Sequence, residues 1–317
     1  MLKRVLLFTL LLLIVLLLIG PKPLTPIYSK DLPSFNDDLE QLSDSINRAE
    51  NNSRVKLNNE AKIIWADTIP VKTEWSIVYL HGFSASQEEG SPIHRQVAKE
   101  FGMNLYLARL SEHGLVSDSA LVNLTADKLW ESAKMALMVG NTIGKKVILM
   151  STSTGGTLAL KLAEQYPDLV AALINYSPNI KINSSFASLM NNRWGGAILK
   201  LMSKEGYIIT AGANDSTISQ YWNTKYRVEA LPQLQELVET TMTEDVFNNI
   251  TCPSLTLVYY KDKDHQDPTV KVSAMRWMHE SLATNKNVKR LIEMSDVGVH
   301  PMASELRSKD IVGVLKQ

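Results

Sequence analysis

The sequence predicts an α/β fold in which a mostly parallel central sheet carries helices on both faces. Between residues 61 and 177, short apolar segments alternate with longer segments of helical periodicity, a pattern typical of βαβ units. The apolar segments are continuous rather than alternating in polarity, as in VILM at 147–150, which is expected of strands buried on both faces. The chain has 317 residues, and the roughly 260 that follow an N-terminal segment suffice for one large domain.

Each expected element follows from its local pattern. Strands are expected at residues 61–67, 75–82, 103–110, 145–151, 169–177, 254–260 and 288–294. Helices are expected at residues 91–102, 125–144 and 157–167, with others after residue 267 and near the C-terminal end. Thr125 is a suitable N-cap for the second helix, and Gly140 lies near its end, so its boundaries are the best marked.

The alternation of strands and helices stops after Ser177 and resumes with the strand that begins at Ser254. A crossover helix needs roughly 15 to 20 residues, so about 50 residues are surplus. Residues 186–206 and 216–247 have helical patterns and many large side chains, so an inserted helical cap at about 180–248 fits better than a long loop. The large cap side chains that suggest an apolar pocket are Trp194, Met202, Tyr221, Trp222 and Tyr226.

Residues 1–20 are predicted to anchor the chain in a membrane. Lys3 and Arg4 precede the sixteen-residue apolar run VLLFTLLLLIVLLLIG, which is just below the ~17 to 25 residues of a spanning helix. Pro21, Lys22 and Pro23 follow in place of a small-residue cleavage site, so an uncleaved anchor is favoured over a cleaved signal peptide or a buried helix. The basic start favours a cytoplasmic N-terminus, which places the rest of the chain outside the cytoplasm, on the periplasmic or extracellular side.

Residues 21–60 are predicted to form a stalk followed by an amphipathic helix. Pro21, Pro23 and Pro26 favour a stiff and extended stalk. The segment at 31–50 then has the apolar spacing of an amphipathic helix, with its apolar residues roughly on one face. That face consists of Leu39, Leu42, Ile46 and Ala49.

Composition excludes several classes of function. The 33 basic and 33 acidic residues balance, and neither sign forms a long run, so we expect no nucleic-acid partner. A Walker-type phosphate loop is absent from the sequence, as judged by its glycine and lysine spacing. Cys252 is the single cysteine, which rules out an internal disulfide and the usual zinc spacings. We therefore expect neither a metal nor an organic cofactor.

Ser153 lies in the segment STSTGGT, between the strand at 145–151 and the helix at 157–167. A strand, a sharp turn and a helix are the setting that a G-x-S-x-G nucleophile elbow requires. Gly155 supplies the small residue two positions after the serine, and Ser151 stands where the motif has its first glycine. We predict that Ser153 is a nucleophile rather than one hydroxyl of a polar loop.

Four further segments make the sequence resemble the α/β-hydrolase superfamily. VYLHGFSAS at 78–86 is similar to the loop that carries one oxyanion donor, and LARLSEHGLVSD at 107–118 is similar to the loop where the family often has Gly-His-Gly. YYKDKDHQDPTVKVSAM at 259–275 resembles the acid loop, and SDVGVHPMA at 295–303 resembles the histidine loop. The resemblance covers roughly residues 61–317. It is greatest to the capped carboxylesterase and monoacylglycerol-lipase branch, which some classifications group with serine aminopeptidases.

This resemblance implies a Ser-Asp-His triad and an oxyanion hole formed by the main-chain N–H groups of Phe83 and Thr154. His300 is the predicted base because it follows the strand at 288–294, late in the chain, and imidazole titrates close enough to neutrality to take the serine proton. The other histidines have other expected places: His81 and His113 brace loops, His94 and His279 lie on helix faces, and His265 lies in the acid loop.

Three aspartates compete for the role of the acid. Asp262, Asp264 and Asp267 all follow the strand at 254–260. Asp262 has the family's usual short distance from the strand, whereas Asp267 begins DPTVKV, in which an apolar residue follows the acid by three positions and leads into a helix. We favour Asp267, with Asp264 and Asp262 left as alternatives.

The sequence therefore predicts a membrane-tethered serine hydrolase that cleaves an acyl ester or lipid through an acyl-enzyme intermediate. Two alternatives stay open at this point. The same triad can serve a peptidase, an amidase or an acyltransferase. The fold can also serve as a binding protein without catalysis.

Overall fold

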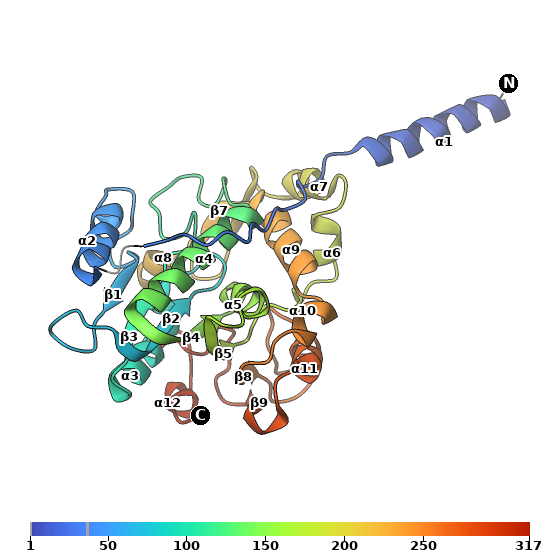
Figure 1. Cartoon of the computed structure of the whole chain (residues 1–317). Coiled ribbons are helices and arrows are strands. Elements are labelled where there is room, and N and C mark those ends of the chain that lie inside the picture. Colours follow the sequence, from blue (N-terminus) through green and yellow to red (C-terminus); the bar gives the residue numbers. More distant parts are fainter. Residues whose placement is uncertain (1, 36–37) are drawn as a thin grey trace.

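A parallel sheet forms the centre of the protein in the computed structural model, which describes residues 2–35 and 38–317 (Figure 1). Within those residues the main sheet has seven strands in the order β1-β3-β2-β4-β5-β8-β9, all parallel except the edge pair β1 and β3. The strands are β1 (Lys62–Ile64), β2 (Thr73–Leu80), β3 (Asn104–Leu107), β4 (Gly144–Thr152), β5 (Val170–Tyr176), β8 (Ser254–Tyr259) and β9 (Lys289–Met294).

Helices cover both faces of this sheet. Side chains of α4 (Ala126–Ile143), α5 (Thr154–Gln165) and α11 (Val272–Ser281) join the larger buried cluster on one face. Side chains of α3 (Ile93–Glu100) and α12 (Ile311–Leu315) join a second cluster on the other face. The strands are apolar on both sides because each side packs against a helical layer. The predicted α/β fold with a mostly parallel sheet is confirmed.

The carboxyl ends of the central strands meet along one edge of the sheet. Leu80 of β2 pairs with Ser151 of β4, Thr152 of β4 with Tyr176 of β5, and Tyr259 of β8 with Met294 of β9. The loops that follow these strands therefore converge, as is usual for sites in open α/β sheets. One short 3₁₀ helix, η1 (Gln87–Gly90), follows β2, and another, η2 (Lys286–Val288), precedes β9.

An insertion between β5 and β8 forms the cap. It contains α6 (Ala187–Met190), α7 (Gly195–Met202), β6 (Tyr207–Ile209), α8 (Ser216–Tyr221), β7 (Lys225–Arg227), α9 (Ala230–Thr241) and α10 (Glu244–Asn248). The helical cap expected from the sequence also contains a two-stranded antiparallel ribbon, in which β6 pairs with β7. The expected helix at 186–206 is also broken. Trp194 adopts φ 66°, and a Cβ on Gly195 would lie 2.0 Å from the carbonyl oxygen of Leu189.

The N-terminal segment forms α1 (Leu2–Ile19), which extends away from the rest of the protein in Figure 1. Across the described residues, no helix combines the length and apolar character needed to cross a membrane.

Residues that follow α1 lie against the α/β domain rather than forming a free stalk. The amide of Ile27 donates to Asp127, and the indole N–H of Trp130 donates to the carbonyl oxygen of Ser29 at 2.8 Å. The buried ammonium group of Lys134 donates to the carbonyl oxygen of Asp31 at 2.6 Å. Residues 27–31 thus run along α4 as a strap.

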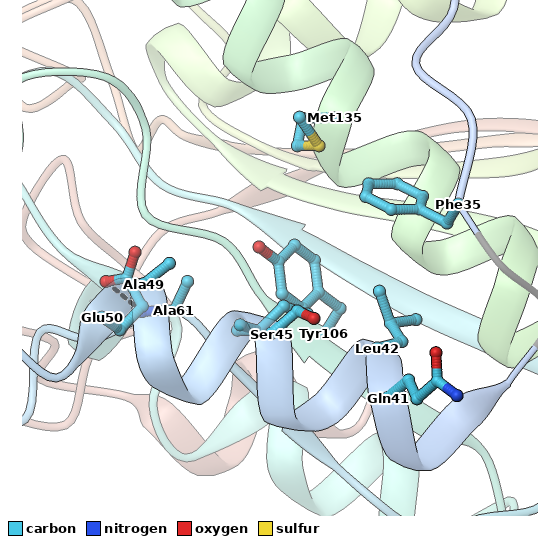
Figure 2. A pocket seen from close by; sticks show the side chains of 10 residues that line it. Phe35, Gln41, Leu42, Ser45, Ala49, Glu50, Ala61, Tyr106 and Met135 are labelled. Carbon is cyan, nitrogen blue, oxygen red and sulfur yellow. Dashed lines mark hydrogen bonds between the residues drawn. The ribbon is translucent and has the colours of Figure 1, made fainter.

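The predicted amphipathic helix is shorter than expected and begins at Leu39. The helix α2 (Leu39–Glu50) follows Asp38, whose side chain accepts from the amide of Gln41 as an N-cap, and such caps favour a helix start at the next residue. Leu42 is buried, and Figure 2 shows it near Tyr106 beside a small cleft of about 340 Å³ between α2 and α4. At its other end α2 is held where Glu50 accepts from two of the three guanidinium nitrogens of Arg109, Nε and Nη2.

Candidate active site

Ser153 occupies a strained turn between β4 and α5. Its backbone has φ 54° and ψ −116°, which is costly for a residue other than glycine and persists only where packing enforces it. The amide of Ser153 donates to the carbonyl oxygen of Tyr176, and its own carbonyl oxygen accepts from the amides of Gly156 and Asn179. These bonds fix the turn and hold the serine side chain at the carboxyl edge of the sheet.

The two residues that flank Ser153 by two positions show why the turn needs small side chains. A Cβ on Gly155 would lie 1.9 Å from the carbonyl oxygen of Leu80, so α5 approaches the end of β2 too closely for any side chain. Ser151 fits at the other position because its hydroxyl donates to the Oδ1 atom of Asn175 on β5 at 2.7 Å. A buried hydroxyl with such a partner is tolerated, which explains how the elbow forms without its first glycine.

His300 is held by Asp267 in the loop after β9. The Nδ1 atom of His300 lies 2.7 Å from Oδ2 of Asp267, while Oδ1 of the same carboxylate accepts from the amides of Thr269 and Val270. Burial acts to raise the pKa of Asp267, but the charge and hydrogen bond of His300, with smaller contributions from Ser177 and Val270, hold it below its usual value. Asp267 is therefore ionised near neutral pH and orients the ring of His300.

The other ring nitrogen of His300 remains available. Among the described residues, no atom forms a hydrogen bond with Nε2 of His300. Burial acts to lower the pKa of this imidazole, but Asp267 raises it through charge and hydrogen bonding and Glu89 raises it further, so the net shift is upward. A neutral imidazole with Nδ1–H on a carboxylate presents Nε2 as an acceptor, which is the state a general base requires.

The two rejected aspartates belong to a solvated turn. Asp262 is half exposed, and its carboxylate accepts from the amides of Asp264 and His265 and pairs with the ring of His265. Asp264 is exposed as well. The loop is longer than the family's usual acid loop because this turn precedes Asp267.

The two predicted oxyanion donors are unpaired. The amides of Gly82, Ser84 and Ala85 all donate to other groups, whereas the amide of Phe83 has no acceptor among the described residues. Thr154 is the first residue of α5, and its amide likewise has no acceptor in the described part of the chain. Free N–H groups at a helix N-terminus favour negative charge, so this pair suits a developing oxyanion.

Two buried histidines brace the loop that carries Phe83. The Nδ1 atom of His81 donates to the carbonyl oxygen of Gly82, and its Nε2 accepts from the amide of Leu110. The Nε2 atom of His113 accepts from the amide of Ser84 at 3.0 Å. Burial lowers the pKa of His81 well below its ordinary value and that of His113 to about 4. Both rings are therefore neutral near pH 7, as these acceptor roles require.

The remaining histidines lie elsewhere. His94 is buried in α3, where its Nε2 bonds to the carbonyl oxygen of Gln87 and its ring packs edge-on against Tyr79. His279 lies in α11, on the helix that follows the acid loop. Within the described residues, no group of three His, Cys, Asp or Glu side chains is arranged to hold a metal ion.

A cavity of about 430 Å³ joins the catalytic groups to the cap. Ser153, Thr154, Phe83 and His300 line it together with Glu89. Its apolar wall comes from the cap and from the loop after β5: Ile182, Met190, Ile218, Trp222, Tyr226, Leu231 and Leu234. Of the cap side chains predicted to form an apolar pocket, Trp222 and Tyr226 contribute, whereas Met202 is exposed on α7.

The sequence pattern did not reveal Glu89 or Arg307 as cavity residues. Glu89 is buried in η1, and the guanidinium of Arg307 lies over the ring of Trp222 at 5.9 Å. Local periodicity carries no signal for either, since one lies in a single 3₁₀ turn and the other in an irregular segment. Both residues line the cavity because the cap lies over the carboxyl edge of the sheet.

The fold, the strained serine turn and the Asp-His pair define a serine hydrolase of the α/β-hydrolase superfamily. A sequence profile of the family described as "serine aminopeptidase, S33" matches residues 132–290, half of the chain. The chain belongs to this family. No curated protein sequence matches it at a significant level.

Solved structures of esterases and lipases share the fold at low sequence identity. A structure of the metagenome-derived lipolytic enzymes LipS and LipT is 15% identical with a TM-score of 0.66, covering 83% of this chain and 96% of that one. The monoacylglycerol lipase of Paleococcus ferrophilus is 15% identical with a TM-score of 0.56, covering 81% and 98%. Est1E from Butyrivibrio proteoclasticus, with ferulic acid bound, is 18% identical with a TM-score of 0.52, covering 81% and 92%.

Proposed function

We propose that this protein hydrolyses a carboxylic ester with an apolar acyl group through an acyl-enzyme intermediate on Ser153. One observation carries the proposal. Asp267 fixes His300 through Nδ1, Nε2 of His300 has no partner among the described residues, and His300 and Ser153 line the same cavity. A nucleophile, a base and an orienting acid in this order are the parts needed to activate a serine hydroxyl.

The first half of the reaction forms the acyl-enzyme. Nε2 of His300 takes the proton of the Ser153 hydroxyl as Oγ attacks the carbonyl carbon of the ester. The negative charge that develops on the carbonyl oxygen is stabilised by the free amides of Phe83 and Thr154. The carbon–oxygen bond to the alcohol then breaks, and His300 returns the proton to the departing oxygen.

The second half releases the acid. A water molecule gives its proton to Nε2 of His300 and attacks the acyl carbon, and Ser153 leaves with that proton. Asp267 stays ionised throughout and stabilises the imidazolium that forms in each half. The cycle returns the enzyme unchanged and consumes one water molecule for each ester.

The cavity supports an apolar acyl or lipid-like substrate. Its volume of about 430 Å³ lies within the range of small-molecule sites, roughly 300–1,000 Å³. Ile182, Ile218 and Leu234 belong to its apolar wall. Such a wall binds a hydrocarbon chain by removing it from water.

A panel of substrates tests the proposal. We expect the protein to hydrolyse p-nitrophenyl butyrate and octanoate, and Ser153→Ala to lose that turnover. Aminoacyl p-nitroanilides test the peptidase and amidase alternative, and product analysis with an added alcohol tests acyl transfer. Hydrolysis of the anilides in preference to both esters would replace the proposal with the peptidase. If the folded protein neither turns over any of these substrates nor reacts with a fluorophosphonate probe, the binding-protein alternative would replace the proposal.

We also propose that the N-terminal segment attaches the enzyme to a membrane, with the catalytic domain outside the cytoplasm. The support is the pair Lys3 and Arg4 at the start of α1, before its apolar run, together with the solvent exposure of apolar side chains such as Leu7 and Phe8 on α1. Fractionation of cells and sequencing of the mature N-terminus test this proposal. Recovery in the soluble fraction, or a mature N-terminus between Gly20 and Tyr28, would contradict it.

A further inference from the structure

A second carboxylate is buried beside the nucleophile. Glu89 is 3% exposed and lines the cavity that contains Ser153 and His300. A Cβ on Gly82 would lie 2.9 and 3.0 Å from the two carboxylate oxygens and 3.0 Å from Cβ of Ser153. The carboxylate and the nucleophile are thus separated by one glycine. Burial of a carboxylate is unfavourable unless hydrogen bonds compensate, and the triad described above does not use this one.

Glu89 holds the loop that carries the oxyanion donor. Its Oε2 atom accepts from the amide of Gly82 at 2.5 Å. The carbonyl oxygen of Gly82 is held in turn by Nδ1 of His81 at 2.9 Å and by the amide of Ala85 at 3.3 Å. In a trans peptide the N–H points opposite to the C=O. Fixing Gly82 on both sides therefore directs the amide of Phe83 away from these partners and leaves it free.

The same carboxylate meets the cap. Trp222 lines the same cavity and acts to lower the pKa of Glu89, and the amide of the next residue, Asn223, donates to the carbonyl oxygen of Ser84 at 2.7 Å. Trp222 also packs in one small apolar cluster with Ala85. The cap segment and the oxyanion loop are therefore joined at Glu89.

We infer that Glu89 is a positioning residue for the oxyanion hole, where its buried carboxylate ties the Gly82 amide to the cap and keeps the Phe83 amide directed at the reacting carbonyl. The inference rests on the proposed ester hydrolysis at Ser153. Removal of the carboxylate should loosen the hole for the transition state and affect ground-state binding much less, because substrate affinity comes mainly from the apolar wall.

The charge of Glu89 also acts on the base. Burial raises the pKa of Glu89 to about 7, while the Gly82 amide, His300, Trp222 and Arg307 oppose that rise. The charged or titratable groups that face Glu89 are His300, Arg307 and the phenol of Tyr79, and Asp267 faces His300 from the other side. A carboxylate stabilises a nearby imidazolium, so loss of the Glu89 charge should lower the pKa of His300.

Two substitutions separate the hydrogen bond from the charge. Glu89→Gln keeps an acceptor for the Gly82 amide and removes the charge, whereas Glu89→Leu removes both. Glu88→Gln, at the neighbouring half-buried position, is the matched control. Rates on p-nitrophenyl butyrate are expressed for each site titrated with a fluorophosphonate, so that only folded enzyme is counted. Inhibition by a trifluoromethyl ketone with the same acyl chain reports binding of a tetrahedral adduct.

We expect Glu89→Leu to lower kcat by roughly 10²-fold, the scale of one lost oxyanion donor, with KM changed by less than about threefold. The inhibition constant of the ketone should rise by a similar factor. Glu89→Gln should keep kcat within about tenfold and move the acid limb of kcat/KM to lower pH, and Glu88→Gln should match the unsubstituted protein.

Two results would overturn the inference: a Glu89→Leu variant with unchanged kcat and ketone inhibition for each titrated site, or a Glu89→Gln variant with an unmoved acid limb. If Glu89→Leu does not fold, the pH profile of Glu89→Gln still tests whether the charge of Glu89 acts on His300. Failure of the unsubstituted protein to cleave any ester would instead reject the proposed function, which distinguishes the two failures.

Discussion

Oδ2 of Asp267 lies 2.7 Å from Nδ1 of His300, although 33 residues separate them in the chain. The pair joins the loop after β8 to the loop after β9, two strands that are neighbours in the sheet. The packing of Val270 and Met275 in the core anchors the segment that Asp267 begins. Rigid support of this kind is what an orienting acid needs.

Asp267→Asn should lower ester turnover by roughly 10³- to 10⁴-fold, because the amide favours the wrong tautomer of His300. The substitution keeps the shape of the side chain and an oxygen for the amides of Thr269 and Val270, so the fold should persist. Asp262→Asn is the matched control in the same loop and should cost less than about tenfold. Steady-state kinetics on p-nitrophenyl butyrate measure both. A large loss of turnover in Asp262→Asn, with near-normal turnover in Asp267→Asn, would show that Asp267 is not the triad acid.

The pH dependence of kcat/KM should report His300. Its imidazole must be neutral to accept the serine proton, and its pKa lies above the ordinary 6.5 because Asp267 and Glu89 outweigh burial. Activity should therefore rise with pH through a midpoint above 6.5. In Asp267→Asn the residual activity should show this limb at lower pH, because the stabilising charge is gone. A limb below 6 in the unsubstituted protein would contradict the assigned environment of the base.

The close packing at the turn of Ser153 predicts that alanine substitutions of two glycines, Gly155 and Gly196, have very different effects on stability. Gly155→Ala places Cβ 1.9 Å from the main-chain oxygen of Leu80, which cannot rotate away. We expect it to lower the free energy of unfolding by roughly 3 kcal/mol or more. In Gly196→Ala the nearest atom, Cγ of Pro232, lies 3.4 Å away, so stability should stay within about 1 kcal/mol. Chemical denaturation compares the two, and equal stability would refute the close approach of α5 to β2.

Deletion of the N-terminal strap should destabilise the protein only if the deletion extends past the residues that hold the strap to α4. A variant without residues 1–27 keeps the carbonyl oxygens that Trp130 and Lys134 use, whereas one without residues 1–35 loses both acceptors. The deletion removes two hydrogen bonds, each worth about 0.5–1.5 kcal/mol, although Lys134 keeps its ion pair with Glu131. Their loss, with the exposure of the surface that the strap covers, should lower the thermal midpoint by roughly 5 °C or more. Calorimetry of the two variants tests this. Equal midpoints would mean that the strap adds nothing to stability.

Much of the fold could be predicted because strands buried on both faces can be recognised in the sequence as continuous apolar segments. Ser153 and His300 were also predictable, since a strained serine turn needs small neighbours and the base loop follows the last strand. The choice among three aspartates rested on the apolar residues that follow Asp267, and it is Asp267 that the structure pairs with His300.

Other features could not be predicted, for physical reasons that apply to each. The ribbon of β6 and β7 has strands of three residues each, so it depends on long-range pairing rather than on local pattern. The strap is held largely through main-chain oxygens of residues 29–31, which no side-chain pattern reveals. Glu89 is enclosed by the loop at Gly82 and lines the same cavity as the cap residue Trp222, and no local sequence pattern reveals these tertiary contacts.

The most direct test of the central claim is covalent labelling of the native protein with a fluorophosphonate, followed by mass spectrometry of the peptides. The account predicts one modified residue, Ser153, with no labelling in Ser153→Ala and normal labelling in Ser151→Ala. Both variants should remain folded by circular dichroism. Labelling that persists in Ser153→Ala, or that disappears in a folded Ser151→Ala, would contradict the assignment of Ser153 as the nucleophile.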